Sequence, residues 1–181
     1  MITLENSVLA KIGRNTHEYQ NYVKRFWERF EYFCSKGFQL KIHSVISPVN
    51  YDSISDLVKK IVAENRFKVS RWKFYQYMTY GQPEKDLVYA ISDEKYQAKC
   101  SEIADLCKDS GIDLSFKGNK IMADTMINLL HSGKIESFTM DGENRIRHLS
   151  KIITEYPTIE DLIKDNQIDI EMFNKYHSIK L

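Results

Sequence analysis

The chain has 181 residues, of which 43% are hydrophobic and 28% charged, as in an ordinary globular domain with a small appendage. Its 26 basic and 25 acidic residues give a net charge of +1, which excludes the strong overall field that gathers nucleic acid or anionic membranes. The sequence contains neither a signal sequence nor a run of about 18 apolar residues, so we expect a cytoplasmic protein with no membrane or nucleic-acid partner. Any anion site must therefore be local.

The first predicted element is a helix between Thr16 and Lys36. Its apolar residues recur at spacings of three and four, as on one helical face: Tyr19, Tyr22, Val23, Phe26, Trp27, Phe30 and Phe33. Gly37 is expected to end it in the left-handed conformation. The next run, Phe38 to Ser47, alternates polar with β-branched or aromatic residues and predicts a strand.

A second helix is expected to begin at Asp52 or Ser53, either of which can cap it. A second strand is predicted from Ser70 to Tyr77. Helix, strand, helix and strand joined by short connections are typical of βα units, so we expect parallel strands.

The pattern changes after Gly81. Ser92 is expected to cap a helix, and a strand is predicted from Ile135 to Met140. Short apolar segments such as Ile121 to Leu130, and two short helices, near Thr158 to Lys164 and Asp169 to Tyr176, complete a small α+β appendage. The expected fold class is thus α/β.

Basic side chains alternate along both predicted strands. Lys41 and His43 lie on the first strand, and Arg71 and Lys73 lie on the second. Period two places each pair on one face, although strands of a parallel sheet are normally apolar on both faces. Two interpretations stay open: an enclosed basic site, or a solvated face of an edge strand, where lysine is common.

An enclosed basic site would require an anion. Two like charges at ~6 Å repel by roughly 3 kcal/mol at an effective dielectric constant of about 20. A triphosphate or a carboxylate would offset this repulsion, with Arg71 able to form a planar fork of hydrogen bonds.

The three cysteines show no metal-binding or redox spacing. Cys34, Cys100 and Cys107 are expected to be buried thiols, and the five histidines show no ligand spacing either. We therefore predict no metal ligand within the chain.

Several segments, taken in order, resemble viperin and its prokaryotic relatives, which are radical S-adenosylmethionine enzymes of antiviral defence. They are KIGR (Lys11 to Arg14), LKIHSVI (Leu40 to Ile46) with Asn50, RWKFYQ (Arg71 to Gln76), AISDEKY (Ala90 to Tyr96) and IEDLIKDNQIDIEMF (Ile159 to Phe173). The resemblance spans nearly the whole chain, and the RWKFYQ strand is its most specific part.

The resemblance implies a fold and a reaction. Viperins are partial (βα) barrels in which a [4Fe-4S] cluster cleaves S-adenosylmethionine, and the radical formed dehydrates a nucleoside triphosphate to a 3′-deoxy-3′,4′-didehydro nucleotide. Residues 1–90 would form part of the barrel and residues 91–181 the C-terminal extension. The resemblance assigns Arg14 to S-adenosylmethionine.

The same resemblance assigns Lys41, Arg71 and Lys73 to the triphosphate of a CTP-like nucleotide. His43 would belong to this site too, although it stands where the family has Asn. Met126 replaces a tyrosine of the pocket, and Asp124 beside it is a further pocket candidate or, alternatively, a cap. Asn15 replaces a glycine in the usual IGRG.

The cluster-binding pattern CxxxCxxC does not occur in the sequence. Met1 falls near the fourth strand of the family's barrel, so the chain is expected to be the C-terminal portion of such an enzyme and inactive alone. An N-terminal half on another chain would complete it. The alternatives are a non-catalytic nucleotide-binding module, alone or as a homodimer, and an interaction protein that docks through its first aromatic helix.

Overall fold

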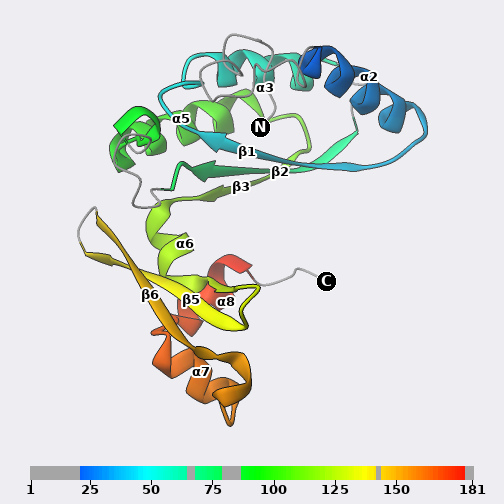
Figure 1. Cartoon of the computed structure of the whole chain (residues 1–181). Helices are drawn as coiled ribbons and strands as arrows, with labels where there is room; N and C mark the ends of the chain where they lie inside the picture. Colours follow the sequence, from blue (N-terminus) through cyan, green and yellow to red (C-terminus); the bar gives the residue numbers. More distant parts are fainter. Residues whose placement is uncertain (1–20, 65–67, 79–86, 142–143, 178–181) are drawn as a thin grey trace. The chain divides into compact units, whose positions relative to one another are not determined.

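The computed structural model describes residues 21–64, 68–78, 87–141 and 144–177. The chain divides into two compact units, Met1–Lys117 and Gly118–Leu181, each of which contains its own sheet (Figure 1). The fold is therefore mixed α/β, with a parallel sheet in the first unit and an antiparallel sheet in the second.

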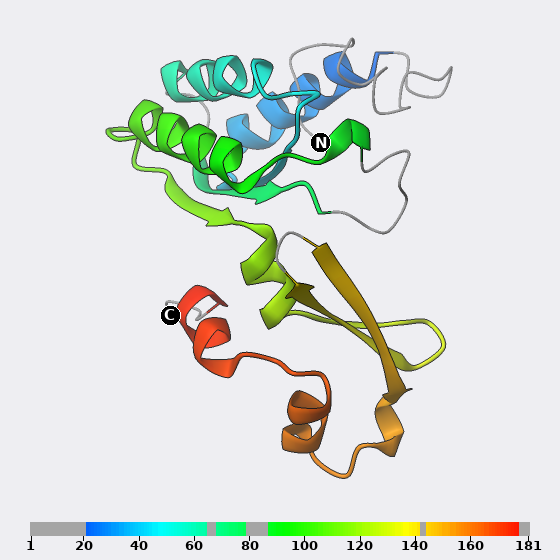
Figure 2. The same ribbon diagram turned by 90° about the vertical axis from the view of Figure 1, so that its left-hand side faces the viewer.

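The first unit is a parallel sheet covered by helices on one side. Its elements in chain order are α2 (Tyr22–Ser35), β1 (Leu40–Ile46), α3 (Ser53–Ala63), β2 (Val69–Gln76), α5 (Asp93–Leu106) and β3 (Asp113–Lys117). The strands run parallel in the order β1-β2-β3, which confirms the predicted parallel sheet. Figures 1 and 2 show α2, α3 and α5 on the same side of this sheet.

The helix-covered face of the sheet forms the hydrophobic core. Trp72 and Phe74 of β2 are fully buried, and their stacked rings lie 4.9 Å apart. Phe116 of β3 continues the stack, with a centroid distance of 5.7 Å to Phe74. Aliphatic side chains of α3 pack against the same cluster, among them Leu57 and Val58. This burial explains why β2 alternates so strictly.

Local signals at the element ends are largely confirmed. Gly37 follows α2 with a φ of 83°, the left-handed conformation that glycine adopts without strain. The hydroxyl of Ser92 accepts a hydrogen bond from the backbone N–H of Lys95 and caps α5. Asp52, by contrast, makes no capping hydrogen bond at the start of α3. One residue of the apolar face predicted for α2 also differs, because Phe33 is 44% exposed.

The second unit combines three short helices with an antiparallel sheet. Its elements are α6 (Asn119–Thr125), β4 (Ile127–Leu129), β5 (Lys134–Asp141), β6 (Asn144–Ile152), the 3₁₀ helix η2 (Ile153–Glu155), α7 (Ile159–Asp165) and α8 (Ile170–His177). The strand order is β4-β5-β6. Helix α6 packs against β5 and α8, and Ile135 and Phe138 of β5 are buried. The predicted strand and both C-terminal helices are confirmed.

Three strands, β3, β4 and β6, were not predicted from the sequence. β3 joins the parallel sheet and, together with α5, belongs to the first compact unit, although both follow the expected boundary at residue 90. β6 pairs along β5, with a register shift between Lys134 and Glu136. Among the described residues, no helix has the length and apolar character needed to cross a membrane.

Candidate anion-binding face of the parallel sheet

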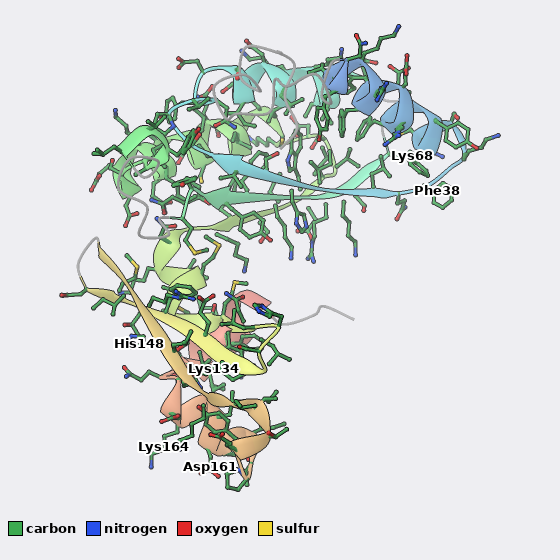
Figure 3. All side chains as sticks on the ribbon, viewed as in Figure 1. Phe38, Lys68, Lys134, His148, Asp161 and Lys164 are labelled. Carbon is green, nitrogen blue, oxygen red and sulfur yellow. The ribbon has the colours of Figure 1, made fainter. Side chains whose placement is uncertain are left out.

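Three rows of side chains cross the sheet face that lies opposite α2, α3 and α5. Read from β1 through β2 to β3, the rows are Lys41, Arg71 and Asp113; His43, Lys73 and Ser115; and Val45, Tyr75 and Lys117. We call these nine residues the basic face. Figure 3 shows nitrogen-tipped side chains projecting from this side of the sheet. The parallel register thus brings the four predicted site residues of the two strands together.

The position of β2 argues against the edge-strand interpretation. β2 pairs with β1 on one side and β3 on the other, so Arg71 and Lys73 lie on a central strand. Their opposite neighbours Trp72 and Phe74 are fully buried under the helices. Lysine on an edge strand can prevent another strand from pairing with the sheet, but β2 is not an edge strand. This role therefore does not explain the charges on β2.

Lys117 is a further cation of the basic face that sequence reasoning missed. Its side chain is 3% exposed, and burial together with the charges of Lys73 and Arg71 lowers the pKa of its ammonium group. The signal was present in the sequence, because Asp113, Ser115 and Lys117 alternate with Leu114 and Phe116. At five residues, β3 was too short to be recognised by pattern.

Asp113 changes the expected role of Arg71. The Nε of Arg71 lies 2.5 Å from Oδ2 of Asp113, so one edge of the guanidinium is already paired. The terminal nitrogens still supply donors, because guanidinium carries five N–H groups.

His43 lies at the β1 end of its row, and its neighbour in the register is Lys73 on β2. Partial burial and the charge of Lys73 lower the pKa of its imidazole, so the ring is neutral near pH 7. The ring centroid lies 5.6 Å from that of Tyr75, whose pKa is raised by burial and whose phenol therefore stays protonated. The fixed positive charges of the face are thus those of Lys41, Arg71, Lys73 and Lys117.

Hydrogen bonds at the carboxyl end of the sheet fix the turn after β1 and tie β2 to the start of α5. Asn50 closes the turn after β1, because its Oδ1 accepts from the Ser47 N–H at 2.9 Å and its Nδ2 donates to the Val45 carbonyl at 2.8 Å. Gln76 donates to the Ile91 carbonyl at 3.0 Å and to Oδ1 of Asp93 at 2.7 Å. These residues carry part of the sequence resemblance, and in the structure they are anchors of the scaffold.

The remaining predicted site residues lie elsewhere. Arg14 falls outside the described residues. Asp124 and Met126 belong to the second unit. Burial raises the pKa of the Asp124 carboxyl, and the backbone carbonyl of Asp124 accepts a hydrogen bond from the Asp169 N–H at 2.9 Å. Met126 follows α6, and 38% of its surface is exposed.

The cysteines do not fit an iron–sulfur cluster. All three are free and buried, as predicted. Burial raises the pKa of Cys100 to about 11 and also raises that of Cys107, whereas cluster ligands must be thiolates. Within the described ranges, no three His, Cys, Asp or Glu residues come together as a metal site.

Comparison with known proteins adds no assignment. No protein-family profile matches the chain, and no curated protein matches its sequence.

Proposed function

We propose that the basic face binds the triphosphate of a pyrimidine nucleotide and that the chain is the nucleotide-binding, C-terminal portion of a viperin-like nucleotide dehydratase. The observation that carries the proposal is the gathering of Lys41, Arg71, Lys73 and Lys117 on one face of a parallel sheet. Three of these positions are the ones that the sequence resemblance assigns to the triphosphate.

The physical argument is electrostatic. Neighbouring strands lie about 4.8 Å apart, and two like charges at ~5 Å repel by roughly 3 kcal/mol at an effective dielectric constant of about 20. Asp113 offsets only part of this repulsion, since it pairs with Arg71. A triphosphate would offset the remainder through charge-assisted hydrogen bonds.

The proposal divides the reaction between this chain and a second component. The three parallel strands would be part of a (βα) barrel, the basic face would hold and orient the nucleotide, and Arg14 would contact S-adenosylmethionine. Because the buried thiols do not fit a cluster, the cluster ligands would come from residues outside this chain. Bound S-adenosylmethionine would supply the radical that attacks the ribose.

The second candidate function is a nucleotide-binding module that does not react its ligand, alone or as a homodimer. It is favoured by the raised pKa of the Cys100 and Cys107 thiols, because protonated thiols do not bind a cluster and the chain would then lack the means to react its ligand. The basic face could bind an anion in either case. Both candidates predict nucleotide binding, and they differ only in turnover.

Titration calorimetry with CTP and UTP tests the binding. We expect Lys73→Gln to weaken binding at least tenfold, because Lys73 lies on the central strand and, unlike Arg71, has no carboxylate opposite it in the register. Lys59→Gln is the matched control, because it makes the same change of net charge at an exposed position on α3 and should leave affinity unchanged. Equal weakening by both variants, or no binding by the unmodified chain, would contradict the proposal.

Complementation separates the two candidates. The chain is mixed anaerobically with a separately produced N-terminal half of a viperin carrying CxxxCxxC, together with iron, sulfide, reductant, S-adenosylmethionine and CTP. A dehydrated nucleotide that forms only when both parts are present supports the enzyme. Tight nucleotide binding without product supports the module.

A further inference from the structure

We infer that His43 takes up a proton when a polyphosphate occupies the basic face, so that its imidazole becomes an additional cation of the site and couples nucleotide binding to pH. This inference rests on the proposed function, because it concerns the same face. It adds a property that the fixed charges of lysine and arginine cannot provide.

The position of His43 carries the inference. His43 is exposed over part of its surface, and it lies within the rows that also carry the fixed cations. The titratable and charged groups of the face around it come from all three strands: Lys41 on β1, Arg71, Lys73 and Tyr75 on β2, and Asp113 and Lys117 on β3. Asp113 stands at the far end of the neighbouring row and is paired with Arg71, so the groups nearest to His43 are cationic or neutral.

This surrounding disfavours the protonated imidazole while the face is free of ligand. Partial burial and the Lys73 charge lower the pKa of His43, because a second positive charge beside Lys73 is unfavourable. A polyphosphate lying across Lys41, Arg71 and Lys73 would reverse the sign of the local potential. The protonated imidazole would then be stabilised and could donate from both ring nitrogens.

The direction of the pH effect follows by linkage. A group that binds its proton more tightly in the complex than in the free protein makes binding tighter as the pH falls. A rise of about one in the pKa of His43 on binding corresponds to a tenfold gain in affinity at the acid end of the titration.

Calorimetry in buffers of different ionisation enthalpy measures the proton uptake. UTP is titrated at pH 6.5 into the unmodified chain and into His43→Asn, which keeps a polar side chain but removes the titration. The terminal phosphate of UTP titrates nearby, so the deciding quantity is the difference between the two proteins. We expect the unmodified chain to take up more protons per nucleotide than the variant, and both to bind.

The outcomes separate this inference from the proposed function. Binding by both proteins with equal proton uptake overturns the role of His43 and leaves nucleotide binding intact. No binding by the unmodified chain contradicts the proposed function, and this inference with it. His43→Gln provides a second variant if His43→Asn does not fold.

NMR gives an independent readout. The imidazole signal of His43 is identified by its disappearance in the variant and is then titrated with and without UTP. A midpoint that moves to higher pH with UTP supports the inference, and an unchanged midpoint overturns it.

Discussion

Two buried lysines show how the surroundings decide the role of one residue type. Lys99 of α5 is 4% exposed, but its ammonium lies 2.5 Å from a Glu102 oxygen, 3.0 Å from the Ser55 hydroxyl and 4.3 Å from the centre of the Tyr51 ring. Lys117 is equally buried but lies on a face shared with Lys73 and Arg71, which lower its pKa. The charge of Lys99 is therefore compensated within the fold, whereas under the proposed function Lys117 would belong to the anion site.

Ser137 in the second unit is a residue whose substitution should raise the stability of the chain. The side chain of Ser137 on β5 is fully buried, and in the part of the chain that the structure describes its hydroxyl has no hydrogen-bond partner. Removal of an unsatisfied buried polar group relieves a desolvation cost, so Ser137→Ala should stabilise the chain by about 1 kcal/mol. Urea unfolding monitored by circular dichroism measures the change.

Ser150 on β6 is the matched control. Its hydroxyl lies 3.0 Å from Oδ1 of Asn166 and 3.4 Å from the Ile135 carbonyl. Ser150→Ala removes a made hydrogen bond and should destabilise the chain by about 0.5 to 1.5 kcal/mol. Destabilisation of similar size by both variants would show that Ser137 has a partner.

Among the elements, α3 and α5 are linked through a buried lysine that also contacts a carboxylate. The ammonium of Lys99 on α5 contacts both Ser55 on α3 and Glu102. Hydrogen bonds from Lys99, and then from Ser55, lower the pKa of the Glu102 carboxyl. A carboxyl with a lower pKa in the folded chain stabilises it above the unfolded value and loses this effect as the pH falls through the folded value.

Glu102→Gln should therefore lower the urea midpoint at pH 6 and reduce the loss of stability between pH 5 and pH 3. The physical reason is that glutamine cannot form the charge-assisted contact with Lys99 and does not titrate. Glu28→Gln is the control, since Glu28 is exposed on α2 and its ammonium partner Lys24 lies 3.9 Å away. An identical pH profile for the unmodified chain and Glu102→Gln would contradict the assignment.

Element prediction succeeded where one periodicity ran long enough. β1 and β2 alternate over seven and eight residues, and their burial follows the same alternation. β6 was missed because its apolar residues Ile146, Leu149 and Ile152 are three apart, a spacing typical of a helix. Pairing with β5 across a register shift makes this segment a strand.

For the whole molecule, charge balance and charge placement have different consequences. The net charge is +1, so no general attraction for anions is expected. The basic face nevertheless gathers four fixed cations on three strands, with Asp113 as the one acidic residue among its nine members. The proposed anion binding would accordingly be a local property of the first unit.

Salt provides the test at this scale. Raising KCl from about 50 to 300 mM should weaken UTP binding by roughly tenfold, because the contacts of an exposed face are screened over a Debye length of about 10 Å or less. Calorimetric titration at three salt concentrations measures the effect. Salt-independent affinity would place the main contacts away from the basic face.

The sequence by itself determined the class of most elements, the parallel connection of β1 and β2 and the cap of α5. It also determined the alternation that puts Lys41 with His43 and Arg71 with Lys73. These follow from local chemistry, because period and capping are readable within a few residues. Only the tertiary structure decided that β2 is central, that β3 adds Lys117 and Asp113 to the basic face, and that Arg71 is already paired. Such features depend on contacts between residues some 40 positions apart, and no local pattern encodes the register that brings them together.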